Sequence, residues 1–491
     1  MRGGSLEVTH PAFLEYSMFA DLRFRRTLRL AVSFFVGVLG SLLFNPANAA
    51  PQADSVQAYQ TIDSALEAAK AAHEPVLVDF SALWCHSCWW MKTNVMNGSD
   101  WEALGKHLVY VESDSDSADG EAWMKKLKIS GLPTYVMLDS SGRELGRIVG
   151  EAKRDEFYPK IDRWVGGADT LEKLKTQAAH GGAVDVAQAL DVYAAREDYT
   201  AAFAWYASLP AVLRQQAAKD AKVVLDLEAM HMKQDKHGLL STKVASEKAA
   251  FAKNCVDHGQ RALASNPDYD DRIDIDTLSD CSDGFPPAQR TALLAAPVST
   301  AAGYLDEQKL SKRPLPPGSR DAVLILGIVS KQIGDPAGSK AIFDRGIAAY
   351  RHQMDDGKGG LDLKKDRSAA DDLYALYRFA GQNDQKMAML KQLAGVYNDD
   401  CNYSLAYGKA LLSDGKAAEA LPYLEKAAGM ATGRYVLRVA KTRAQALIAL
   451  QRRHDAEIVV SDALQTVGSW FPEDKEELKH LLNSDAKKNA P

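Results

Sequence analysis

The sequence predicts a mixed α/β domain followed by a longer, all-α region. Between residues 50 and 167, strand-like and helix-like segments alternate, whereas alanine- and leucine-rich helical patterns continue from residue 168 to the end. A Cys85-x-x-Cys88 pair lies where a strand-like segment changes into a helix-like one. The 491 residues are too many for one hydrophobic core, so we expect several domains.

The composition narrows the classes of partner. Hydrophobic residues make up 46% of the chain and charged residues 25%, which is typical of globular proteins. The formal net charge of −6 provides no basic surface. We therefore expect neither nucleic acid nor an anionic membrane surface as a partner.

The N-terminus predicts a signal peptide over residues 1–49. Arginines precede an apolar run of about 15 residues, Leu30 to Phe44, and Ala47-Asn48-Ala49 follows as a small-x-small cleavage pattern. The run is shorter than the roughly 20 residues that a spanning helix needs, but an uncleaved anchor stays open as an alternative. Met18 is an alternative start. We expect an exported, periplasmic protein with no membrane span after cleavage.

The α/β domain, residues 50–167, is expected to hold a mixed sheet flanked by helices. The predicted elements are a helix over 55–72, a strand over 76–80, a helix after Cys85, a strand over 108–111, a helix over 121–127, strands over 134–138 and 144–149, and a closing helix over 157–164. A tight turn joins the last two strands, whereas helices link the earlier ones. That combination implies both parallel and antiparallel pairs.

The segment Trp84-Cys85-His86-Ser87-Cys88 places two thiols one helical turn apart. The first sulfur is expected near a helix N-terminus, where unpaired N–H groups and the helix dipole stabilise a thiolate and lower its pKa. Such a pair can exchange disulfides. It could also bind zinc, but no second Cys/His pair stands nearby at ligand spacing, so we expect no metal.

Four positions together resemble the thioredoxin family, over about 115 residues. Asp79 falls at the position of the family's buried acid, and Trp84 at that of its tryptophan before the first cysteine. The Cys85/Cys88 pair and Gly131-Leu132-Pro133-Thr134 match the family's active site and cis-proline loop. The resemblance implies a thioredoxin fold and thiol–disulfide exchange without a cofactor.

The resemblance also implies roles for individual residues. Cys85 would attack first, and Cys88 would resolve the mixed disulfide. Pro133, cis in the family, would place the Leu132 backbone beside the sulfurs, where it can bind an extended substrate. Asp79 would have a raised pKa and relay a proton for Cys88, or it would be a strand-end acid bonded by neighbouring N–H groups.

His86 leaves the direction of electron flow open. A cationic imidazole beside the thiolate would stabilise the reduced form and favour an oxidant. In family members with a histidine between the cysteines, it commonly precedes the second cysteine, whereas here it follows the first. The chain could thus be a reductase, an oxidase or an isomerase. Trp84, His86 and Leu132 are candidates for the substrate groove.

Three further cysteines lie in the helical region. In an oxidising compartment, Cys255 and Cys281 are candidates for a structural disulfide, and the alternative is two free, buried thiols. Cys401 is expected to be buried and inert.

The helical region is expected to contain tetratricopeptide-like repeats over 319–480. We predict a helical domain over 168–318, either irregular or repeated, and a polar tail over 481–491. Small and large residues recur in two successive copies, at Gly408, Leu411, Gly415, Ala420, Leu424 and Ala427 and then at Ala444, Leu447, Ala456, Val460 and Ala463. Such residues let helix pairs stack into a solenoid. An irregular helical domain is the alternative.

These features predict an envelope thiol–disulfide oxidoreductase. Its partners would be protein substrates with thiols or disulfides, a redox partner protein, and a protein or peptide held by the helical repeats. The alternatives are a non-catalytic scaffold or holdase in which the repeats are the functional surface, and a redox sensor whose cysteine state alters partner binding.

Overall fold

The computed structural model describes residues 56, 58–167, 170–265, 273–468 and 470–488. The predicted signal peptide at 1–49 lies outside these residues. The chain divides into two compact units. Among the described residues, the larger unit holds those up to Ser113 and those within Ala122–Val396, and the smaller unit holds Asp114–Glu121 and those from Tyr397 onward.

The described residues form a mixed sheet, as the sequence predicts, with five strands in the order β1-β3-β2-β4-β5. The strands are β1 (Ala58–Tyr59), β2 (Val76–Ser81), β3 (Val109–Asp114), β4 (Thr134–Leu138) and β5 (Glu144–Val149). β1 runs parallel to β3, whereas β4 runs antiparallel to both β2 and β5. In this register Asp79 of β2 lies opposite Tyr135 of β4.

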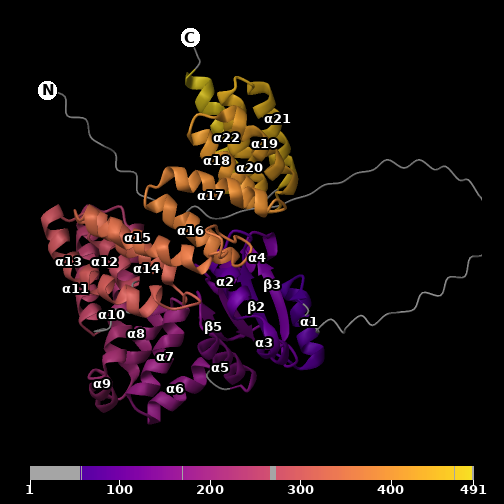
Figure 1. Ribbon diagram of the computed structural model, residues 1–491. Helices are drawn as coiled ribbons and strands as arrows, with labels where there is room; N and C mark the ends of the chain where they lie inside the picture. Colours follow the sequence, from indigo (N-terminus) through magenta and orange to yellow (C-terminus); the bar gives the residue numbers. More distant parts are fainter. Residues whose placement is uncertain (1–55, 57, 168–169, 266–272, 469, 489–491) are drawn as a thin grey trace, which may run out of the picture. The chain divides into compact units, whose positions relative to one another are not determined.

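Helices flank the sheet (Figure 1). They are α1 (Ile62–Ala72), α2 (His86–Asn94), α3 (Gly98–Leu104), α4 (Ala118–Leu127) and α5 (Arg154–Val165). Side chains of β2 alternate between two cores: Leu77 packs with Met91 of α2 and Phe157 of α5, whereas Val78 packs with Ile62 of α1. The strand VLVDFS is buried along its whole length because both faces are covered.

The sequence places the first helix too early. The structure has strand β1 at Ala58–Tyr59, and α1 begins only at Ile62. Thr61 caps this helix because its hydroxyl accepts a hydrogen bond from the Ser64 N–H at 3.2 Å. Helix α3 and strand β1 are not among the predicted elements; both are short, and short elements carry little periodic signal.

The rest of the larger unit is helical. Its elements are α6 (Leu171–His180), α7 (Ala183–Ala195), α8 (Tyr199–Ser208), α9 (Ala211–Ala217), α10 (Ala221–Ser241), α11 (Ala245–Ser265), α12 (Ile273–Cys281), α13 (Pro287–Leu305), the π-helical turn η1 (Asp306–Leu310), α14 (Ser319–Gln332), α15 (Pro336–Gln353), α16 (Arg367–Phe379) and α17 (Asn383–Val396).

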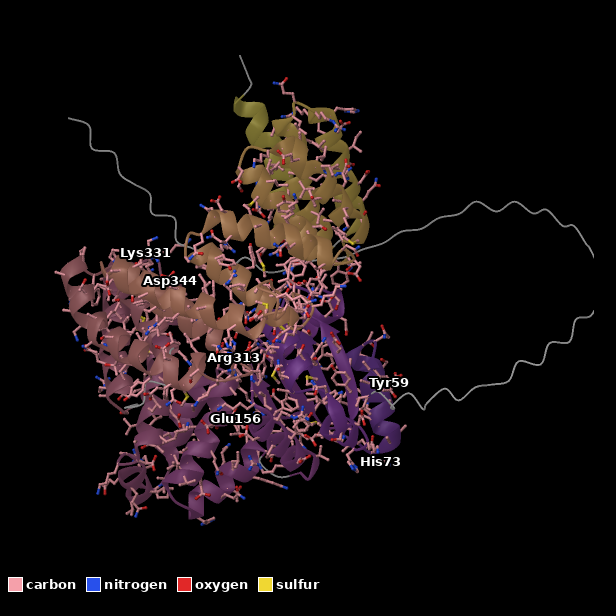
Figure 2. All side chains as sticks on the ribbon, viewed as in Figure 1. Tyr59, His73, Glu156, Arg313, Lys331 and Asp344 are labelled. Atoms are coloured by element: carbon pink, nitrogen blue, oxygen red, sulfur yellow. A yellow bond between two sulfur atoms is a disulfide. The ribbon has the colours of Figure 1, made fainter. Side chains whose placement is uncertain are left out.

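Helices α14 and α15 form a tightly packed hairpin. A Cβ on Gly327 would lie 2.5 Å from the Phe343 ring, so only glycine allows this approach. The apolar faces turn inward, whereas Lys331 and Asp344 are exposed on the outside of the hairpin (Figure 2). Helix α16 packs against α2, the helix that carries Cys88.

The smaller unit has tetratricopeptide-like helix pairs. Its helices are α18 (Cys401–Ser413), α19 (Ala417–Met430), α20 (Tyr435–Ala449), α21 (Arg453–Thr466) and α22 (Pro472–Lys488). A Cβ on Gly408 would lie 2.6 Å from Leu424, which explains the small residue in α18. One core joins α20, α21 and α22 through residues that include Ala444, Leu447 and Val460. The repeat pattern in the sequence is therefore the packing pattern of these helices.

The cysteines form two disulfides. One joins Cys85 to Cys88, and the other joins Cys255 of α11 to Cys281 of α12. Cys401 is a buried free thiol, and its pKa is raised to about 12 because burial disfavours the thiolate. None of the helices in the described residues is both long and apolar enough to cross a membrane.

Candidate active site around Cys85 and Cys88

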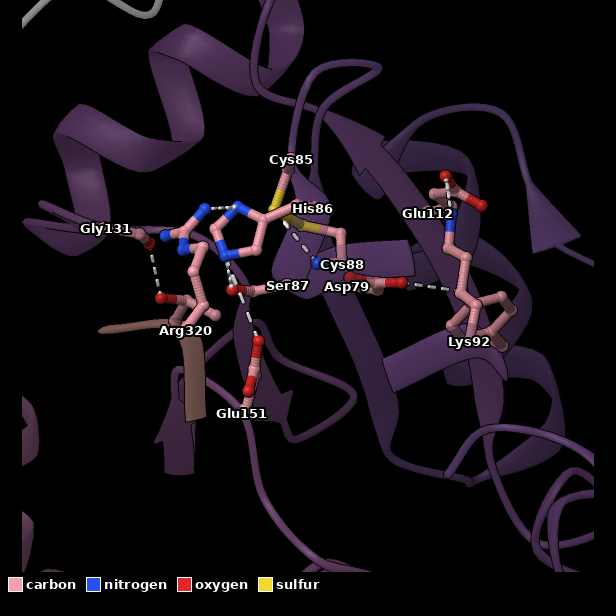
Figure 3. The surroundings of a disulfide bond; sticks show 12 residues. Asp79, Cys85, His86, Ser87, Cys88, Lys92, Glu112, Gly131, Glu151 and Arg320 are labelled. Carbon is pink, nitrogen blue, oxygen red and sulfur yellow. Dashed lines mark hydrogen bonds and ion pairs between the residues drawn. A yellow bond between two sulfur atoms is a disulfide. The ribbon is translucent and has the colours of Figure 1, made fainter. Parts of the chain in front are cut away.

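The two active-site cysteines lie at the start of α2. Cys85 is the N-cap residue with an extended backbone, and its sulfur accepts a hydrogen bond from the Cys88 N–H at 3.1 Å. The two sulfurs are joined in a disulfide (Figure 3). Because the helix N–H groups point at the Cys85 sulfur, the reduced form would carry its thiolate there.

Both cysteines are nearly inaccessible. Cys85 is 3% exposed and Cys88 is fully buried. Ala82, Trp84 and Leu132 pack around them. The structure therefore brings two of the predicted groove residues, Trp84 and Leu132, into contact with the cysteines. The Leu132–Pro133 peptide bond is cis.

Asp79 is a buried acid in β2 with a single hydrogen bond. The Tyr110 hydroxyl donates to its Oδ2 at 3.0 Å, and its Oδ1 has no hydrogen-bond partner among the described residues. The pKa of Asp79 is raised to about 7 because burial disfavours the carboxylate; Lys92 opposes this shift and Glu112 adds to it. The partner is thus a phenol rather than the neighbouring N–H groups of the alternative interpretation.

Tyr110, Lys92 and Glu112 are site residues that the sequence analysis did not identify. Lys92 of α2 forms an ion pair with Glu112 of β3. The pKa of Tyr110 is well above its ordinary value because the residue is buried beside Asp79. A signal was available for Tyr110, because it lies in the strand predicted over 108–111, whereas Glu112 lies beyond the end of that prediction.

His86 is bonded at both ring nitrogens. The Arg320 Nη1 lies 2.7 Å from its Nδ1, and the Ser87 Oγ lies 2.7 Å from its Nε2. The pKa of His86 is well below its ordinary value because the ring is buried and because the Arg320 cation repels a second positive charge. Both causes favour the neutral imidazole over the cation considered from the sequence.

Two further residues complete what we call the His86 network, which consists of His86, Ser87, Glu151, Gly318 and Arg320. Figure 3 shows the four of these residues that contribute side chains, His86, Ser87, Glu151 and Arg320. Glu151, just after β5, accepts a hydrogen bond from the Gly318 N–H at 2.8 Å and lies 4.0 Å from His86 Nε2. The side chains of His86, Glu151 and Arg320 are only 17%, 13% and 19% exposed. Burial raises the pKa of Glu151.

The His86 network connects the active-site helix to the helical region. Arg320 lies in α14, and Gly318 ends a proline-rich segment that follows Arg313 (Figure 2). On the adjacent face of α2, the Arg367 guanidinium of α16 lies 3.9 Å from the Trp89 ring centroid, a cation–π contact. No local motif signals these partners, because Arg320 is 234 positions from His86.

Part of the chain is similar to known proteins. A sequence model of the thioredoxin-like family matches residues 57–140. A thioredoxin H-type from Fagopyrum esculentum is 31% identical over 93 residues, which are 19% of this chain and 74% of that protein. The thiol:disulfide interchange protein DsbD of Ralstonia nicotianae is 30% identical over 116 residues, and the match spans 23% of this chain and only 19% of that relative.

A solved tetratricopeptide repeat protein from Parabacteroides merdae aligns with 62% of this chain and 98% of its own length, with 14% identity and a TM-score of 0.35. The family assignment rests on the N-terminal segment, where the matched residues 57–140 include Asp79, Trp84, Cys85, Cys88 and Pro133. Through this α/β domain, the chain belongs to the thioredoxin-like family.

Proposed function

We propose that this chain is an envelope thiol–disulfide oxidoreductase that exchanges disulfides with protein substrates through Cys85 and Cys88. The observation that carries the proposal is the disulfide at the start of α2, with a buried acid of raised pKa in the neighbouring strand. Relatives named as interchange proteins and thioredoxins support the same chemistry. Export is supported by the arginine–apolar–Ala49 pattern of the sequence.

The exchange needs no group beyond the two thiols and a proton acceptor. The Cys85 thiolate attacks one sulfur of a substrate disulfide, forms a mixed disulfide and releases the first substrate thiolate, which takes a proton from water. Cys88 then loses its proton to Asp79 and attacks Cys85, which releases the second substrate thiolate and closes the Cys85–Cys88 disulfide. Two electrons pass to the substrate, and a dithiol partner must restore them.

The low exposure of Cys85 limits which substrates can react. A residue that is 3% exposed offers little surface for contact with a substrate disulfide, so a substrate must displace a neighbouring group before exchange. We infer that the helical regions select and hold such partners, as proteins or peptides. Concave surfaces built from stacked helix pairs are suited to that task.

The same low exposure favours a second candidate function. In it, the helix pairs bind a protein and the thioredoxin-like domain is a structural or redox-sensing module. The Cys85→Ser/Cys88→Ser double variant of the full chain separates these functions: it would lose its biological function if the chain is an oxidoreductase or a redox sensor, and it would keep that function only if the thioredoxin-like domain is a structural module.

The test of the proposed function is reduction of a protein disulfide, such as that of insulin, by the full chain with dithiothreitol as the electron donor. Cys85→Ser should abolish the acceleration. Cys401→Ala, which removes a buried thiol of the smaller unit, should retain it. Unchanged activity in Cys85→Ser would exclude the oxidoreductase.

A further inference from the structure

The hydrogen-bond directions in the His86 network follow from the chemistry of one residue. A guanidinium has donors and no acceptor, so Arg320 Nη1–H must donate to Nδ1 of His86. Nδ1 therefore carries no proton, and the proton of the neutral ring is on Nε2, which donates to the Ser87 Oγ. The hydrogen bond from the Ser87 hydroxyl in turn stabilises the ionised form of Glu151 and so lowers its pKa.

The surroundings oppose a second proton on the ring. A proton on Nδ1 would face the Arg320 donors at 2.7 Å, and the positive charge would be buried next to a guanidinium. The other end of the network is fixed by the Gly318 N–H, which holds Glu151. The cavity beside His86 is narrow, and the network residues that line it are His86, Glu151, Gly318 and Arg320.

The charge of Arg320 is itself balanced locally. Its Nη2 lies 2.7 Å from Asp321 Oδ1, and its Nε lies 3.9 Å from Asp372 Oδ1. The titratable groups around His86 and Arg320 come from every packed element and are Asp321 on α14, Glu151 after β5, Tyr350 on α15, and Asp371 and Asp372 on α16. Arg320 thus opposes a second proton on the ring in two ways, as a directed donor to Nδ1 and through its positive charge.

We propose that Arg320 is a positioning residue of the redox centre, which holds His86 as the neutral Nε2–H tautomer so that no imidazolium forms beside Cys85. The consequence rests on the proposed function. Without an imidazolium, the Cys85 thiolate loses a stabilising charge, and the Cys85–Cys88 couple is less oxidising than a histidine in that position would otherwise make it. Helix α14 thereby favours the reductase direction.

The test uses the full chain and two measurements that need no substrate. Nitrogen NMR of the His86 side chain should show an unprotonated Nδ1 and a protonated Nε2 between pH 5.5 and 8. The thiol–disulfide equilibrium of Cys85/Cys88 with glutathione, measured over the same range, should show no step from His86. A ring that becomes doubly protonated within this range in the unmodified chain would overturn the proposal.

Arg320→Met removes the donor and keeps the apolar stem. We expect His86 then to take up a proton as the pH falls below 7 and the equilibrium at pH 5.5 to shift about tenfold towards the dithiol, which corresponds to about 30 mV. Lys331→Gln, an exposed cation on the same helix, should leave the equilibrium unchanged. Arg320→Lys should restore the unprotonated Nδ1. The proposal is contradicted if the glutathione equilibrium of Arg320→Met depends on pH in the same way as that of the unmodified chain.

A second variant, His86→Gln, tests whether the ring carries a charge in the otherwise unmodified chain, so it is informative even if Arg320→Met fails to fold. In the unmodified chain, a neutral ring contributes no charge, so His86→Gln should change the glutathione equilibrium less than about threefold between pH 5.5 and 8. In the Arg320→Met background it should remove the pH step. A large effect of His86→Gln alone at pH 5.5 would refute the proposal, whereas loss of insulin reduction in the unmodified chain would refute only the proposed function.

Discussion

Asp79 and Glu151 are two buried carboxyl groups in the surroundings of the redox centre, and they differ in how their oxygens are bonded. Among the described residues, Asp79 has one hydrogen bond, from Tyr110, and an oxygen without a partner. Glu151 is held by the Gly318 N–H and by the Ser87 hydroxyl. Burial raises both pKa values, but only Asp79 is left with unused bonding capacity. The comparison separates a group that can exchange a proton from one that fixes geometry.

The largest expected effect is on the chemistry of Asp79. Asp79→Asn keeps the shape of the side chain but cannot take the proton of Cys88, so the rate of disulfide reduction should fall about a hundredfold at pH 7. Glu67→Gln, which changes an exposed carboxyl of α1, should leave the rate unchanged. Insulin reduction by the two variants measures this difference, and equal rates would remove Asp79 from the mechanism.

The next effect is on stability as a function of pH. The pKa of Asp79 is about 7 in the folded chain and 3.8 in the reference state, so between these values the folded chain holds a proton that the unfolded chain has lost. The contribution of Asp79 to stability therefore falls as the pH rises through this window. From pH 5 to pH 8, the unmodified chain should lose on the order of 2 kcal/mol relative to Asp79→Asn.

Urea unfolding of the oxidised chain at pH 5 and at pH 8 checks this expectation. Glu67→Gln serves again as the control, because an exposed carboxyl should not alter the difference between the two pH values. A constant difference in the free energy of unfolding between the unmodified chain and Asp79→Asn would show that Asp79 does not titrate in this window.

The smallest expected effect belongs to Glu151. Glu151→Gln keeps a carbonyl oxygen that can accept from the Gly318 N–H, but its amide NH2 group cannot accept a hydrogen bond, so we expect a loss of about 1 kcal/mol in the free energy of unfolding. The rate of disulfide reduction should stay within about threefold of the unmodified chain. A hundredfold loss of the reduction rate would show that Glu151 is as important for the reaction as Asp79, which contradicts the difference proposed between the two groups.

The sequence predicts the sheet, the cysteine helix and the burial of Asp79, because local periodicity and a short motif carry that information. It also predicts the helix pair around Gly408, where the small residue is explained by Leu424. It does not predict the Arg320–His86 contact, because residues 234 positions apart meet only through tertiary packing. Tyr110 is only partly predictable. Its strand follows from the sequence, but the hydrogen bond from its hydroxyl to Asp79 can be inferred only when the order and register of the strands are known.

The Gly318 N–H bond to Glu151 and the Arg320 bond to His86 couple the dipeptide between the cysteines to a helix far along the chain. Mutational drift at these positions is then constrained jointly. A lineage that replaces His86 removes the acceptor for Arg320, and one that replaces Arg320 changes the charge that His86 can carry. Among descendants of a common ancestor, residues 86 and 320 should therefore change together, and the redox potential of the Cys85–Cys88 pair should change with them.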